Sequence, residues 1–207
     1  DIAEFWRRWH ISLSTWFRDY LYIPLGGSKG GTLMKVRNTF IIFIVSGFWH
    51  GANWTFIVWG ALNALYFLPL LLPNKNRANT NNVAQDRYLP TIREFFKITI
   101  TFSLTVLAWV VFRADNISHA INYLTTIFSK SLISLPSFPQ MKLAFYTLLL
   151  IGLFLLIEWL GRDKQYAIEN INSIKSKYLR YCFYFGIVFL IMFMGNFKEN
   201  QFIYFQF

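Results

Sequence analysis

The sequence Ser46-Gly47-Phe48-Trp49-His50-Gly51-Ala52-Asn53-Trp54 joins two apolar runs, Thr39–Phe48 and Ala52–Leu72. The second run has the roughly 20 apolar residues that a membrane-crossing helix needs, whereas the first is too short to cross alone. Together the runs are too long for one straight span, and the glycines predict where the helix breaks. A break at membrane depth is tolerated only where it lines a cavity or is buried in protein. We therefore expect a membrane protein with a helix break beside His50.

Three more apolar runs are long enough to cross a bilayer, namely Phe95–Phe112, Leu143–Leu160 and Leu179–Met194. The chain of 207 residues is 55% hydrophobic and 20% aromatic, and only 14% of it is charged. A soluble domain of this size carries about 25% charged residues. The composition therefore predicts an all-α, polytopic membrane protein with about four spanning helices.

The formal net charge of +10 is distributed between the apolar runs and is not gathered in one patch, which disfavours nucleic-acid binding. Ten basic residues lie in or beside the loops that follow the first and third spans: Lys75, Arg77, Arg87, Arg93, Lys97, Arg162, Lys164, Lys175, Lys177 and Arg180. Four lie on the other side: Arg113, Lys130, Lys142 and Lys198. This bias predicts that the loops Asn74–Glu94 and Gly161–Tyr178 face the cytoplasm.

The opening segment has its own periodicity. Its large apolar residues recur at spacings of three and four, which is typical of one stripe along a helix: Trp6, Trp9, Leu13, Trp16, Phe17 and Tyr20. We expect one helix over Trp6–Tyr20, ended by Pro24, Gly26 and Gly27. Such a helix could lie in the membrane interface or dip in and line a funnel, and periodicity alone does not decide.

His50 is the most informative residue for chemistry, because an ionisable group among aromatic side chains is costly unless it has a partner or a task. Desolvation favours the neutral imidazole, which is the form that a general base requires. A structural histidine, hydrogen-bonded to a neighbouring helix, accounts for the same pattern. From the residues alone the two interpretations have about equal weight.

His10 lies at the edge of the aromatic stripe, with Ser14 one helical turn later, and its position alone favours a solvated histidine. The two histidines come with no third ligand and no cysteine pair, so a metal site is not indicated. The chain has no phosphate-binding glycine loop of the usual spacing and no Gly-x-Ser-x-Gly elbow. A membrane histidine without a nucleophilic serine or cysteine favours direct transfer to an acceptor hydroxyl.

Two blocks of the sequence, Glu4–Gly27 and Ser46–Trp54, closely resemble the signature of the membrane-bound O-acyltransferase family. They are most similar to the branch that serves alginate O-acetylation, as are Trp109–Ala114 and the closing Phe202–Phe207. The resemblance implies helices arranged around a tunnel. It also implies that residues 1–207 are the carboxyl-terminal part of a single acyltransferase domain, whose amino-terminal part is missing here.

The resemblance implies that His50 is the catalytic histidine and that His10 is its partner. We expect substrate contacts from four neighbouring residues: Ser14, Trp49, Asn53 and Trp54. The implied enzyme is a multi-pass protein of the bacterial inner membrane, with no bound cofactor and with acetyl-CoA as the acyl donor.

By the same resemblance, the acetyl group crosses the membrane to a periplasmic acetyltransferase or esterase-like partner, which acetylates an exported, alginate-like polysaccharide. A sister branch transfers D-alanine from a carrier protein to teichoic acid with very similar blocks. The residues also leave open a non-enzymatic channel or scaffold in which His50 is structural.

Overall fold

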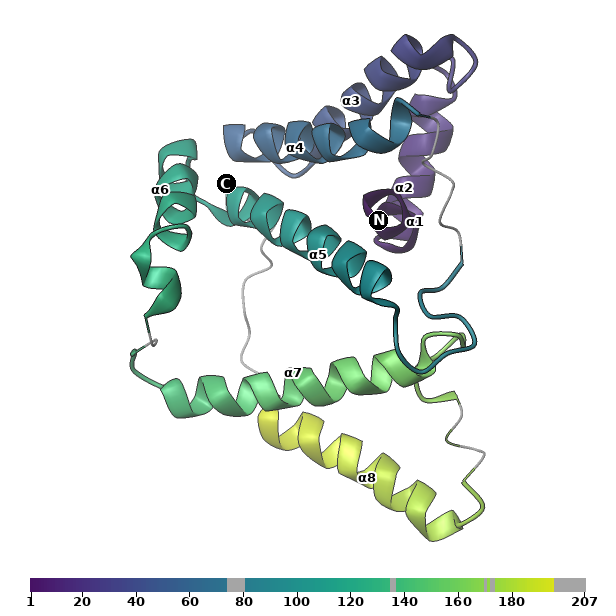
Figure 1. The fold of residues 1–207 in the computed structure, drawn as a ribbon, viewed down its shortest axis with the longest axis vertical. Coiled ribbons are helices and arrows are strands. Elements are labelled where there is room, and N and C mark those ends of the chain that lie inside the picture. Colours follow the sequence, from purple (N-terminus) through teal and green to yellow (C-terminus); the bar gives the residue numbers. More distant parts are fainter. Residues whose placement is uncertain (74–80, 135–136, 170, 172–173, 196–207) are drawn as a thin grey trace. The chain divides into compact units, whose positions relative to one another are not determined.

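The computed structural model describes residues 1–73, 81–134, 137–169, 171 and 174–195 (Figure 1). Within these ranges all the regular structure is helical and no strand is present. The chain divides into two compact units, one of Asp1–Ala84 with Leu89–Ser134 and the other of Gln85–Tyr88 with Leu135–Phe207. The block Phe202–Phe207 lies outside the described residues.

Four helices are long and apolar enough to cross a membrane: α4 (Trp54–Leu71), α5 (Ile92–Arg113), α7 (Met141–Gly161) and α8 (Lys177–Met194). They correspond to the four predicted runs, so the all-α polytopic fold class is confirmed. No side chain in the apolar window of α7 or α8 is buried within the protein, which is the exposure expected of lipid-facing helices.

Polar caps explain why two of these helices begin before the apolar runs do. The hydroxyl of Thr91 accepts from the backbone N–H of Glu94, whose carboxylate accepts from the backbone N–H of Thr91. This reciprocal capping box starts α5 at Ile92, three residues before the predicted span. Ser176 caps the start of α8, because its hydroxyl accepts from the backbone N–H of Leu179.

Helices α3 (Gly31–Trp49) and α4 form a hairpin in which the two backbones touch (Figure 1). A Cβ atom at Gly47 would overlap the backbone of Phe56 on α4, and a Cβ atom at Gly60 would overlap the backbone of Phe43 on α3. Two glycines, one on each helix, therefore permit a closer approach of α3 and α4 than any larger residue would allow. The predicted break falls between the two helices, at Gly51, whose φ of +144° is open only to glycine.

The expected single helix over Trp6–Tyr20 is wrong. The chain forms α1 (Ile2–Arg8), α2 (Ile11–Phe17) and a π-helical turn, η1 (Arg18–Tyr22). Trp9 is extended and His10 is left-handed, with φ +47° and ψ +54°, so the chain bends between α1 and α2.

The tryptophans of this segment bind different helices, which is the physical reason for the bend. Trp6 packs against Phe43 of α3 with ring centroids 5.3 Å apart. Trp9 packs against Trp109 of α5, also with centroids 5.3 Å apart. A straight helix would present both rings along one stripe, and tertiary packing overrides that local pattern. The location of this segment in the membrane interface stays a prediction.

The first unit is completed by α6 (Ile117–Ile127) and a short 3₁₀ turn, η2 (Lys130–Ile133). The amide of Asn53, at the start of α4, donates to the backbone carbonyl of Asp115 at 2.8 Å. This bond ties the break between α3 and α4 to the connection between α5 and α6.

We expect Gly60→Ala in the complete protein to lower the detergent melting temperature, because the added methyl group forces the two helices apart. Overpacking of this kind costs about 1–3 kcal/mol. Gly152→Ala on α7 is the matched control, because a Cβ there meets no described atom within 4 Å. An unchanged melting temperature in Gly60→Ala would contradict the close contact of α3 and α4.

Candidate active site

His50 ends α3 and lies under three aromatic rings. Its backbone N–H donates to the carbonyl of Gly47 at 3.0 Å. Its imidazole lies 5.5 Å from the ring of Trp59, 5.0 Å from Phe112 and 6.2 Å from Phe56, measured between centroids. The residue is half-buried and its Nδ1 atom is buried. Side chains from α4 and α5 thus enclose a histidine that the end of α3 supplies.

The turn after His50 is built so that these rings can approach. A Cβ at Gly51 would lie 2.9 Å from the ring of Phe56, closer than real Cβ atoms come. Asn53 then starts α4, because its side-chain oxygen accepts from the backbone N–H of Thr55 at 3.1 Å. The Asn53 amide therefore has both polar ends engaged, one by this cap and one by Asp115.

Burial lowers the pKa of the His50 imidazole below its usual value, and positive charge on His10 lowers it further. His50 lies between α3 and α4, outside the four candidate spans. A lowered pKa keeps the imidazole neutral near neutral pH, as a general base requires. The influence of His10 also means that the fold brings the two histidines within electrostatic range of each other.

His10 occupies the left-handed corner between α1 and α2 and is exposed. Histidine is one of the few non-glycine residues enriched in this conformation. The carbonyl of His10 accepts from the backbone N–H of Ser14 at 3.0 Å, and Trp9, its neighbour, stacks on Phe5 at 5.6 Å. Packing on both sides therefore holds the corner that presents His10.

The other predicted substrate-contacting residues differ in exposure. Trp49 and Trp54 are 64% and 73% exposed as whole residues, and the ring of Trp49 contacts that of Trp16 with centroids 6.2 Å apart. The Ser14 hydroxyl donates to the carbonyl of Trp9 at 3.3 Å. Asn53 and Ser14 thus make structural hydrogen bonds, and the substrate contacts of all four residues stay predictions.

The sequence reasoning missed Asn63, a polar residue in the middle of α4. Its side chain is 2% exposed, accepts from the indole N–H of Trp6 at 3.2 Å and donates to the carbonyl of Trp59 at 2.9 Å. The bond anchors α1 on α4, within the segment that leads to His10. A lone amide in an otherwise apolar span was the signal that could have identified it.

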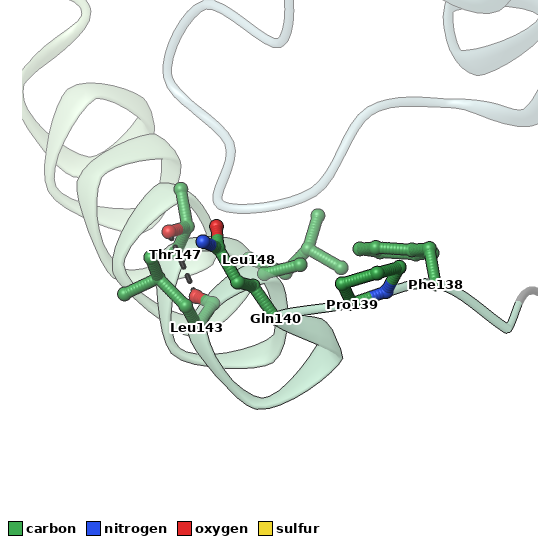
Figure 2. Close-up of a pocket in the computed structure, with 7 residues that line it drawn as sticks. Phe138, Pro139, Gln140, Leu143, Thr147 and Leu148 are labelled. Carbon is green, nitrogen blue, oxygen red and sulfur yellow. Dashed lines mark hydrogen bonds between the residues drawn. The ribbon is translucent and has the colours of Figure 1, made fainter.

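The second unit has a hollow of its own at the start of α7 (Figure 2). It is open and mostly apolar, and it is lined by Phe138, Pro139, Gln140, Leu143, Ala144, Thr147 and Leu148. None of the candidate residues lies there, so the hollow is not part of the histidine site.

The model of MBOAT, the membrane-bound O-acyltransferase family, matches residues 1–112. The match covers α1 to α4, nearly all of α5 and the two candidate histidines, His10 and His50. The chain therefore belongs to the membrane-bound O-acyltransferase family, and the resemblance of its two sequence blocks is confirmed.

Similar proteins come from several bacteria. The probable alginate O-acetylase AlgI of Pseudomonas aeruginosa is 46% identical over 129 residues, which are 62% of this chain and 23% of that protein. The peptidoglycan O-acetyltransferase of Helicobacter pylori is 42% identical over 124 residues, 60% of this chain and 22% of that protein. The teichoic acid D-alanyltransferase of Streptococcus thermophilus is 31% identical over 128 residues, 54% of this chain and 30% of that protein. No solved structure matches the chain.

The chain thus spans about a quarter of the length of the curated relatives that it matches. Its four apolar helices and its bacterial relatives identify it as a multi-pass protein of the bacterial inner membrane, in contact with the lipid bilayer.

Proposed function

We propose that this chain forms the histidine-bearing part of a membrane O-acyltransferase, and that His50 is its general base. The observation that carries the proposal is the half-buried imidazole enclosed by Phe56, Trp59 and Phe112 at a helix break. Aromatic walls exclude water, which favours the neutral base and strengthens electrostatic interactions with the substrate.

The transfer proceeds by direct attack of the acceptor hydroxyl on the thioester carbonyl carbon. His50 takes the hydroxyl proton as the new C–O bond forms. The C–S bond then breaks, and the imidazolium returns the proton to the departing thiolate. Because Nδ1 is buried, we assign proton transfer to Nε2. General-base catalysis of this kind contributes about 10²–10⁴-fold to the rate.

The donor in this proposal is acetyl-CoA on the cytoplasmic side, and the acetyl group crosses the membrane for O-acetylation of an exported, alginate-like polysaccharide. The names of the Pseudomonas aeruginosa and Helicobacter pylori relatives, an alginate O-acetylase and a peptidoglycan O-acetyltransferase, support an acetyl group and a glycan polymer. A periplasmic acetyltransferase or esterase-like protein is the proposed partner that completes the transfer to the polymer.

The second role that we propose belongs to His10, as a residue that orients the donor or acceptor beside His50. It is supported by the left-handed corner at His10 and by the electrostatic effect of His10 on His50. A left-handed non-glycine residue costs free energy, and such strain persists where the surrounding packing imposes it, often at functional sites.

Two alternative functions predict different experimental results. The Streptococcus thermophilus relative favours D-alanyl transfer to teichoic acid, for which the transferred group would be D-alanine and the donor a carrier protein. A channel or scaffold with a structural His50 would consume no thioester. The mass of the acyl group on the product, together with the dependence of thioester consumption on His50, separates the three.

We expect His50→Gln and His50→Ala in the complete protein to lower polymer acetylation by about 10²–10⁴-fold, because the general base is lost. Membrane abundance and detergent melting should stay normal. Acetylation of the polymer, abundance and melting are measured on the same membranes. Retained acetylation, or a loss that follows unfolding, would return His50 to a structural role.

We expect His10→Ala to move the acid limb of the pH–activity profile to higher pH. His50 is active when neutral, so activity falls as the pH drops through the pKa of His50. Positive charge on His10 lowers that pKa, and its removal therefore raises the pKa and the pH at which activity is lost.

His119→Ala is the control for this shift. His119 is exposed, belongs to α6, and its Nδ1 lies 3.2 Å from the carboxylate of Asp115. Its acid limb should match that of the unmodified protein. The electrostatic role of His10 would be refuted by an acid limb that stays in place in His10→Ala.

A further inference from the structure

Two buried polar atoms of α4 have no hydrogen-bond partner among the described residues: Oγ1 of Thr55 and Nε1 of Trp59. Thr55 is 0% exposed and Trp59 is 4% exposed. A buried donor without an acceptor costs folding free energy, and native proteins contain few of them. Each such donor therefore calls for an explanation, of which a bound ligand is one.

One of the two donors, Trp59, lies next to the candidate base, and the other lies on the same face of α4. Thr55 and Trp59 are four residues apart, so they occupy the same face of α4, one turn from each other. The ring of Trp59 stands perpendicular to the imidazole of His50, with centroids 5.5 Å apart. An indole N–H and a hydroxyl both donate, and the indole cannot accept through its nitrogen.

The other buried threonines explain why Thr55 differs. Thr39 and Thr105 each donate to the carbonyl four residues earlier in their helix, both at 2.8 Å. Thr55 is the second residue of α4, so the corresponding carbonyl belongs to Gly51, in the turn before the helix. The helix break beside His50 thus leaves a hydroxyl unused at a helix start, where the partial positive charge of the helix favours negative charge.

We propose that the hydroxyl of Thr55 and the indole N–H of Trp59 bind the carbonyl oxygen of the thioester donor and stabilise the oxyanion that forms from it. The inference rests on the proposed function, with His50 as the base. As the acceptor oxygen bonds to the carbonyl carbon, the π-electron pair moves onto the carbonyl oxygen, which accepts hydrogen bonds from both donors. When the C=O bond re-forms, the thiolate leaves and no proton of Thr55 or Trp59 is transferred.

The burial of these atoms sets a condition on entry of the acyl group. Phe56 and Phe112 contact the His50 ring and each other, with 4.9 Å between the centroids of the two phenylalanines. The acyl group reaches the donors when these rings move aside, and it then occupies a site closed to water. Preorganised donors in such a site act with little reorganisation.

The test uses two substitutions that each delete one donor in the complete protein. Thr55→Val keeps the shape of the side chain, whereas Trp59→Phe also leaves a void among the rings of Trp6, His50 and Phe112. Thr55→Ser restores the hydroxyl. Thr105→Val is the matched control, because it removes a buried hydroxyl that is already bonded within α5. Each variant is assayed in membranes with acetyl-CoA for kcat and KM, and its melting temperature is measured in detergent.

We expect Thr55→Val and Trp59→Phe to lower kcat by about 10²–10³-fold, as the loss of an oxyanion donor does. The melting temperature of Thr55→Val should equal or exceed that of the unmodified protein, because an unsatisfied buried group is removed without loss of volume. That of Trp59→Phe should fall, because the smaller ring leaves a void. Thr55→Ser and Thr105→Val should keep kcat near normal. In Thr55→Val, lower activity with undiminished stability separates a substrate-binding role from a structural one.

Normal kcat in Thr55→Val and Trp59→Phe, with loss of transfer in His50→Gln, would overturn this inference and leave the proposed function intact. A fall in the melting temperature of Thr55→Val that parallels its fall in kcat would overturn it too, because the hydroxyl would then serve a buried water or the fold. Retained transfer in His50→Gln would instead refute the general base, and this inference would fail with it.

Discussion

The backbone contact between α3 and α4 is the constraint on which the rest of the first unit depends. Gly47 and Gly60 permit it, because each faces the backbone of the other helix with no room for a Cβ. Two helices so close must be joined by a sharp turn, and Gly51 supplies the required conformation. His50 is held at the end of α3 by that turn, and Phe56 and Trp59 of α4 then reach its ring. The close contact of α3 and α4 thus places an ionisable side chain among aromatic rings.

Composition and glycine placement were sufficient to predict the spans and the break. About 20 apolar residues are needed for a span, and each of the four runs approaches that length. The start of α5 at Ile92 could also have been predicted, since Thr91 and Glu94 form a capping box that is visible in the sequence. The bend at His10 could not, because the spacing of Trp6 and Trp9 fits one straight helix and only their partners on α3 and α5 separate them.

Some residues of the candidate site could likewise be identified from the sequence, and others could not. His50 was identifiable because an ionisable residue in an apolar setting is unusual wherever it occurs. Phe112 and Trp59 were not, because their contacts with His50 join helices that are distant in the sequence. Asn53 was predicted to contact the substrate, which stays a prediction, and the structure adds that its amide caps α4 and holds the α5–α6 connection. A side chain in the Ser46–Trp54 block can thus hold the backbone in place as well as contact a substrate.

Several features of this site oppose folding and are offset by packing elsewhere. His10 adopts a left-handed conformation, the pKa of His50 is lowered by burial, and the donors of Thr55 and Trp59 lack acceptors among the described residues. All of these residues lie within residues 1–112, the segment that matches the family model. Departures from the usual preferences for backbone conformation, burial and hydrogen bonding are most often found at functional sites, where the rest of the fold compensates for their cost. Their occurrence in one segment is consistent with the proposal that this region is the reaction centre.

The central claim is that the α3–α4 hairpin holds a neutral imidazole in a site sheltered from water. The most direct measurement is a pH titration of His50 by ¹⁵N nuclear magnetic resonance, in the complete protein with labelled histidine in lipid nanodiscs and with His50→Gln for assignment. The account predicts a pKa for His50 below the ordinary value of 6.5. A pKa at or above 6.5 would contradict it, because His50 would then be solvated or paired with an anion, and α3 and α4 would not enclose it.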